Sequence, residues 1–206
     1  SFSDKADINI AIMCGMASCF SALFGTPISA SIFSMEIFSV GVMYHAALIP
    51  CLLSSYIAVY MAKLVNTPVE KFIMQRAPEW NFRLIGFMIL LAALTAMVAI
   101  LFSVVMHESA NIYKKYFKNP YIRIVVAAIL FIILTIISGS RDYNGGGFWL
   151  IERSMEGDVR YEAFLMKIIF TAVAMGGGFK GGEIVPTFVI GATFGGAFAK
   201  FFGLPY

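Results

Sequence analysis

Long apolar stretches separated by short polar segments are the main pattern of this chain. Residues 84–106 contain no charged side chain, residues 124–138 form a shorter apolar run, and residues 40–62 contain only His45 as a possible charge. A helix needs about 20 apolar residues to cross a bilayer, and none of these runs alternates as the strands of a membrane barrel do. The pattern predicts an all-α membrane protein with several crossing helices.

Glycine and proline divide the apolar stretches at several points. Gly25-Thr26-Pro27 interrupts the small-residue segment 8–38, which predicts two short helices in place of one long span. Asn66-Thr67-Pro68 ends the next helix and begins a polar connection. We then expect one long, tilted helix near residues 83–116.

The C-terminal part contains two more breaks. A glycine-rich connection over residues 139–160 precedes a predicted helix at 161–174, and a second glycine-rich break at 176–186 follows it. Pro186 fits the first turn of a further helix that runs to about Phe202, because the N–H at that position would have no partner within the helix.

The composition agrees with a membrane protein. The 206 residues are 60% hydrophobic and 13% charged, whereas soluble domains are about 45–50% apolar and about 25% charged. A net charge of +3 gives no reason to expect a nucleic-acid partner. Cys14, Cys19 and Cys51 form no CxxC pair, so we expect packing thiols. The first ten residues lack both Met and the pattern of a signal peptide, so we expect an internal piece of a longer chain.

The broken helices are the candidate sites, because irregular backbone at membrane depth persists only beside protein or a water-filled cavity. The start of a helix has unpaired N–H groups and about half a positive charge, which suit an anion. The N–H groups of Glu183, Ile184 and Val185 would lie at such a start, after glycines that leave the backbone uncovered. The alternative is that these glycines only allow helices to pack closely.

Three polar side chains are candidates for a role at these breaks. Glu36 lies in an apolar segment, and a carboxylate within the membrane is costly enough to suggest a functional role. The alternative is an acid near a helix end that faces the membrane interface. Glu183 lies on the break itself, with an ion pair to Lys180 as the alternative. Asn144 could donate its amide to an anion, although holding a turn is the favoured role.

Other classes of function find little support in the sequence. An intramembrane acid/base enzyme using Glu36, His45 or Glu183 would need a nucleophile or a metal cluster, and the sequence shows no such motif. His107-Glu108 lacks the second His of a zinc protease motif. Gly-Gly-Phe-Lys-Gly-Gly is not followed by the Lys-Ser/Thr pair of a nucleotide loop. We therefore predict no enzymatic activity, no metal and no cofactor.

The order of three sequence segments indicates a protein family more specifically than any single motif does. FGTPISASIFSME, then GGGFWLI, then GGGFKGGEIVPTFVIGATFG resembles the CLC family of chloride channels and anion/proton antiporters. Gly182-Glu183-Ile184-Val185-Pro186 is similar to the GxFxP anion motif of that family, with Ile184 in place of Phe. The segments GFKGGE and Arg141-Asp142-Tyr143-Asn144-Gly145 are most similar to the fluoride/proton antiporter branch.

The resemblance implies an architecture of two inverted halves whose broken helices meet at the anion, in a homodimer with one pathway per subunit. By position, residues 1–62 would be the end of the first half, residues 63–82 a connecting segment, and residues 83–206 the beginning of the second half. The protein would lie in the bilayer of a bacterial plasma membrane and exchange fluoride or chloride for protons.

The resemblance also assigns roles to single residues. Gly182, Glu183, Ile184 and Val185 would bind the anion. Glu183 and Glu36 are the candidates for proton coupling, and Asn144 is the candidate for lining the pathway.

Several departures from the family pattern limit these assignments. Chloride exchangers usually have a proton-relaying glutamate where this chain has Ile37, and the fluoride branch often has a hydroxyl residue where it has Val185. The GSGIP-like and GREGP-like motifs, the second with the gating glutamate, do not occur in this sequence. The choice of fluoride over chloride therefore stays open, as does that of an antiporter over a passive, voltage-gated-type chloride channel.

Overall fold

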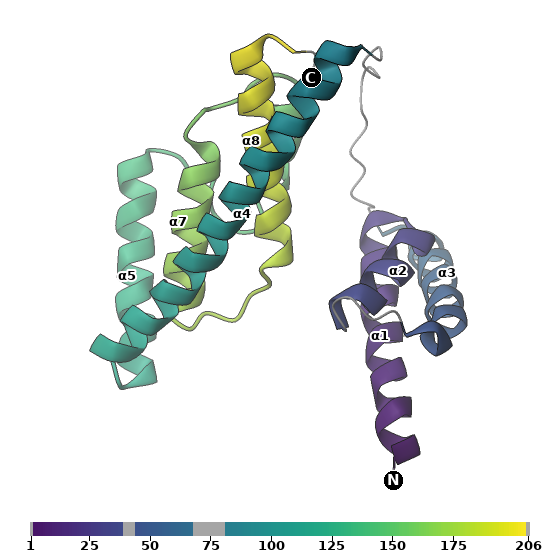
Figure 1. The fold of residues 1–206 in the computed structure, drawn as a ribbon. Helices are drawn as coiled ribbons and strands as arrows, with labels where there is room; N and C mark the ends of the chain where they lie inside the picture. Colours follow the sequence, from purple (N-terminus) through teal and green to yellow (C-terminus); the bar gives the residue numbers. More distant parts are fainter. Residues whose placement is uncertain (1, 39–43, 68–80, 205–206) are drawn as a thin grey trace. The chain divides into compact units, whose positions relative to one another are not determined.

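The computed structural model describes residues 2–38, 44–67 and 81–204, and the regular structure in these ranges is entirely helical. Five of the described helices are long and apolar enough to cross a membrane. This confirms the predicted all-α class. In chain order the helices are α1 (Phe2–Phe24), α2 (Pro27–Phe38), the 3-10 helix η1 (His45–Ala47), α3 (Leu48–Leu64), α4 (Phe82–Tyr116), α5 (Pro120–Ser138), α6 (Phe148–Met155), α7 (Ala163–Gly176) and α8 (Ile184–Phe202) (Figure 1).

The chain forms two compact units, Ser1–Ile73 and Met74–Tyr206. The predicted stop precedes their boundary: α3 ends at Leu64, and Asn66 then adopts a positive φ of 54°. Most of the predicted connection 63–82 lies outside the described residues. The assignment of the two units to the halves of an inverted repeat remains a prediction.

The first unit is built from α1, α2 and α3 around small side chains. The predicted break is present, because α1 ends at Phe24 and Gly25 turns the chain with a φ of 68° before α2 begins at Pro27. Only α2, with 12 residues, is the short helix expected, whereas α1 has 23 residues and is long enough to cross a membrane. Two hydroxyls tie the helices: Ser21 Oγ donates to the Ser55 carbonyl at 2.9 Å, and Ser31 Oγ to Ser55 Oγ at 3.1 Å. Small polar residues of this kind let membrane helices approach closely.

The helix expected over residues 40–62 lies later in the structure. A 3-10 turn at His45–Ala47 leads into α3, which runs two residues beyond the expected end, and residues 39–43 lie outside the described part. Cys51 of α3 is buried in the core of this unit, and its Sγ lies 3.8 Å from that of Cys14. Both are free thiols.

The second unit is organised by α4, which crosses α7 and α8 (Figure 1). Its 35 residues confirm the long helix expected near residues 83–116. The core between these helices is formed by Val98 and Phe102 of α4, Ile168 of α7 and Ile190 of α8.

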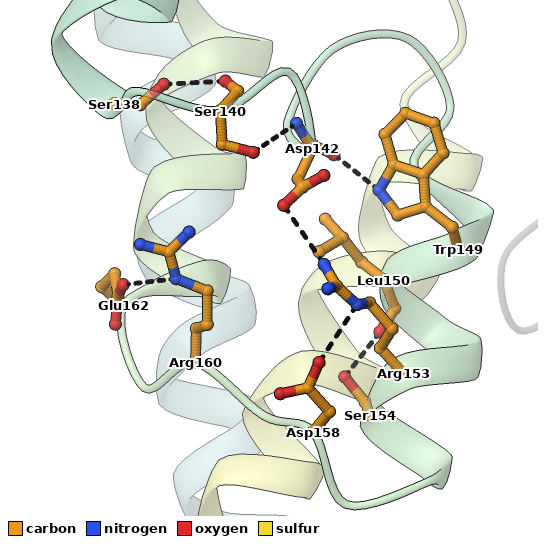
Figure 2. A network of polar contacts seen from close by, with 10 residues as sticks. All are labelled: Ser138, Ser140, Asp142, Trp149, Leu150, Arg153, Ser154, Asp158, Arg160 and Glu162. Carbon is orange, nitrogen blue, oxygen red and sulfur yellow. Dashed lines mark hydrogen bonds and ion pairs between the residues drawn. The ribbon is translucent and has the colours of Figure 1, made fainter.

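The connection 139–160 contains a helix that the sequence analysis did not predict. α6 buries Leu150, Ile151 and Ser154 on one face, and it packs on α8. Its other face belongs to a polar network, in which Arg153 pairs with Asp142 at 3.3 Å and with Asp158 at 3.1 Å (Figure 2). This segment is therefore folded against the helices rather than a simple loop, and the helix expected at 161–174 begins and ends two residues later than predicted.

Candidate functional site

The glycine-rich break between α7 and α8 consists of two parts with different surroundings. A Cβ on Gly177 would collide with the Cβ of Ala127 on α5, and Gly178, with a φ of 102°, lies against the guanidinium of Arg123. By contrast, a Cβ on Gly181 or Gly182 would meet no atom within 4 Å. The first glycines allow close packing, whereas the later ones leave backbone beside open space.

The start of α8 has unpaired donors. Glu183 is the N-cap and makes no side-chain capping bond, and Thr187 N–H donates to the Glu183 carbonyl at 3.1 Å. Among the described residues, none accepts a hydrogen bond from the N–H of Glu183, Ile184 or Val185. Pro186 is the third residue of the helix, within the first turn as expected. The helix dipole adds to the positive potential at this end.

The two glycine-rich breaks meet at one cavity of about 400 Å³. A Cβ on Gly146, in the first break, would lie 3.7 Å from Cγ1 of Val185 in the second. The cavity lies among α5, α7, the start of α6 and the start of α8. Its lining residues are Phe131, Tyr143, Gly145, Gly146, Phe148, Lys167, Phe170, Thr171, Ala174, Met175, Gly181, Gly182, Val185 and Pro186.

The predicted anion-binding residues are distributed around this cavity. Gly182 and Val185 line it, whereas Glu183 is exposed and Ile184 is half-buried outside the lining. The ion pair considered between Glu183 and Lys180 is not formed. The Glu183 carboxylate is thus unpaired next to the open helix start.

The other two candidates are not among the residues that line the cavity. The N–H of Asn144 donates to the Arg141 carbonyl at 3.1 Å, and Thr135 Oγ1 donates to Asn144 Oδ1 at 3.3 Å. Asn144 therefore holds the turn that precedes the glycines. Glu36 belongs to the first unit, where it is exposed two residues before the end of α2.

Lys167 is a cavity residue that the sequence analysis missed. It lies in the second turn of α7 and is only 1% exposed. Its Nζ donates to the carbonyl of Gly145 at 2.7 Å and to that of Tyr143 at 3.1 Å. A single charge within the apolar stretch AFLMKIIFTAVAMG was the signal that could have revealed it.

Comparisons with known proteins agree with one another. The family model described as "Voltage gated chloride channel" matches residues 1–205. A chloride/fluoride channel protein of Pseudomonas syringae pv. tomato is 26% identical over 98% of this chain and 46% of its own length. The crystal structure of a CLC-type fluoride/proton antiporter superposes with a TM-score of 0.89 at 29% identity, over 95% of this chain and 50% of that chain. This chain therefore spans about half the length of the relatives that it matches.

Proposed function

Because this chain belongs to the voltage gated chloride channel family, we propose that it is part of a membrane protein that exchanges fluoride, in preference to chloride, for protons. The likeness to a solved fluoride/proton antiporter over 95% of the chain supports this choice within the family. The chain spans half of that relative, so the activity is proposed for the full-length protein. We also propose a homodimer in a bacterial plasma membrane, which is what the family resemblance implies.

The observation that carries the proposal is the open start of α8 beside the cavity. The N–H groups of Glu183, Ile184 and Val185 have no acceptor among the described residues, and Gly182 and Val185 line the cavity. A dehydrated anion can accept hydrogen bonds from such donors, and the dipole of α8 favours its charge. We assign the central anion to this position.

The smaller radius of fluoride is a reason to propose fluoride, and not chloride, as the transported anion. The attraction between an anion and an N–H donor increases as the separation falls, so a small ion gains more from close donors than chloride does. Fluoride also loses more on dehydration, so selectivity requires donors that are fixed in place before the ion arrives. Amides at the first turn of a 19-residue helix meet this requirement.

Proton coupling is assigned first to Glu183 and second to Glu36. A carboxylate next to a bound anion is repelled in its charged form, so an occupied site favours the protonated side chain. By linkage, protonation of Glu183 then favours anion binding to the same extent. Glu36 is the second candidate because it is a carboxylate on an apolar helix, where charged side chains are rare.

The test is transport by the full-length protein in proteoliposomes, with fluoride efflux and proton uptake recorded together. We expect fluoride efflux faster than chloride efflux and a fixed ratio of fluoride to protons. Faster chloride flux would instead assign the protein to the chloride branch of the family. Fluoride flux without proton uptake would indicate a passive channel.

The role of Glu183 is tested in the same assay. Glu183→Gln removes the titrating group while leaving the backbone amides, so proton movement should be abolished or uncoupled from fluoride efflux. The matched control is Glu152→Gln, which changes an exposed carboxylate of α6 that does not line the cavity. An unchanged fluoride-to-proton ratio in Glu183→Gln would remove Glu183 from the mechanism.

A further inference from the structure

Lys167 is the one charged residue among the buried side chains of the described ranges. A buried ammonium group costs several kcal/mol unless its charge is compensated. Both hydrogen-bond acceptors of Lys167 are neutral carbonyls, and no carboxylate of the described residues pairs with it. The charge therefore lacks a counter-ion within the part of the chain that the structure describes.

The ammonium group also has donor capacity left. A lysine side chain has three N–H groups, and the carbonyls of Tyr143 and Gly145 use two of them. Gly147, with a φ of 79°, leaves room for this group, since a Cβ there would lie 3.0 Å from Nζ. One N–H of Lys167 remains for a ligand.

Lys167 shares its cavity with the start of α8. Lys167 lines the same space of about 400 Å³ as Gly182 and Val185, and it is the one charged residue in that lining. This volume is many times the roughly 30 Å³ that one water molecule occupies in the liquid, so an anion and several waters fit. The charge of the lining is thus positive.

We propose that the Lys167 ammonium group is a direct ligand of the transported anion, with its third N–H as donor and the anion as its counter-ion. This inference rests on the proposed function, because it assigns a further ligand to the same cavity. We assign the ligand class as a small inorganic anion, because the carbonyls of Tyr143 and Gly145 use two of the three N–H groups and leave a single donor for the ligand. Lys167 then supplies the charge attraction, and the amides of α8 supply the neutral donors.

The test is fluoride binding by the detergent-solubilised full-length protein, measured by titration calorimetry beside the transport assay. Lys167→Met keeps most of the stem and removes the charge, and it should weaken fluoride binding by about tenfold or more, as expected for a lost hydrogen bond to a charged group. Lys167→Arg keeps the charge and should restore most of the affinity. If Lys167→Met does not assemble, Lys167→Gln, which retains N–H donors for the two carbonyls, provides the same comparison.

Lys200 offers a matched control on α8. Its Nζ also donates to a loop carbonyl, that of Val159 at 2.9 Å, but it does not line the cavity. Lys200→Met should lose some thermal stability and bind fluoride as the wild type does. A Lys167→Met or Lys167→Gln protein with wild-type fluoride affinity would overturn the inference and leave Lys167 as a brace for the glycine loop. A wild type that binds fluoride without transporting it would contradict the proposed function alone.

Discussion

Single glycines in the break after α7 differ in what they contribute, although the sequence presents them as one run. Gly177 is needed for contact with α5, whereas Gly182 borders the cavity. Both interpretations that the sequence left open, close packing and exposed backbone, therefore apply, each to a different part of the run. Composition could not separate them, because the difference depends on which helix lies opposite each glycine.

Gly177→Ala should destabilise the protein through a steric collision with Ala127. The backbone at Gly177 has a φ of −69°, which alanine adopts without strain, so only the added methyl group matters. We expect a loss of about 1–3 kcal/mol in the free energy of unfolding, as for other overpacked sites. The thermal unfolding of the full-length protein in detergent measures it.

The double variant Gly177→Ala with Ala127→Gly provides the control. Removing the Ala127 methyl group frees the space that the new one needs, so part of the lost stability should return. Because Ala127→Gly itself weakens α5, the comparison is made against that single variant: if Gly177→Ala costs as much stability in the Ala127→Gly protein as in the wild type, the contact with α5 is not the cause.

The contacts of Lys167 could not be predicted from its position in the sequence. The charge within an apolar helix was visible in the sequence, but its partners are carbonyls of Tyr143 and Gly145, more than 20 residues away. No local pattern encodes such a contact. The start of α8 was predictable from Pro186 and the glycines before it, but not that Gly182 and Val185 line the cavity while Glu183 and Ile184 do not.

Among the helices, length decided what could be predicted. α4 and α8 are long and apolar, so their existence followed from the hydrophobic pattern. α6 has only eight residues and includes Glu152 and Arg153, and helices this short depend on tertiary packing rather than on propensity. Its stabilising contacts with α8 were not visible in the sequence.

The contribution of the segment between α6 and α7 to the stability of the fold should decrease slightly at acidic pH. A hydrogen bond from its own backbone N–H, together with Arg160, whose Nε lies 2.9 Å from Oε1, holds the pKa of Glu162 below its ordinary value of 4.5. A lowered pKa in the folded state means that this stabilisation is complete above the ordinary value and is lost as the pH falls through the lowered one. Both side chains are about half exposed, so the effect should be less than about 1 kcal/mol.

This expectation can be checked with Glu162→Gln in the full-length protein. Its melting temperature should be slightly below that of the wild type at neutral pH, and the difference should vanish well below pH 4.5, the ordinary value. Glu156→Gln, at another exposed carboxylate next to α6, is the control for the loss of one surface charge. A difference that does not change with pH would mean that the Arg160–Glu162 pair is not responsible.

At the scale of the whole molecule, the chain contains the N-terminus of α8 beside a cavity. It covers only part of the length of its relatives. It spans half of the solved antiporter, and the gating motif of the family does not occur in this sequence. The order of segments was enough to place the chain in its family.

The 206-residue chain alone, reconstituted in liposomes, should therefore conduct no selective anion flux. The family resemblance implies that several broken helices meet to enclose the anion, and the described residues bring only α8 and its neighbours to the cavity. Fluoride efflux from liposomes measures this, with the full-length protein as the positive control. Robust flux from the shorter chain would show that it already contains a complete pathway.

The length of α4 has a consequence for experiments on membrane sidedness. Its 35 residues span about 52 Å, and confining them to a hydrocarbon core of about 30 Å would need a tilt of about 55°, beyond the usual range. The polar last turns, with the exposed Lys114 and Lys115, therefore emerge into the aqueous phase. A membrane-impermeant reagent for amines would reach these two side chains from one face of a sealed vesicle only. Labelling of Lys114 and Lys115 from outside would therefore show that the C-terminal end of α4 lies on the outer side.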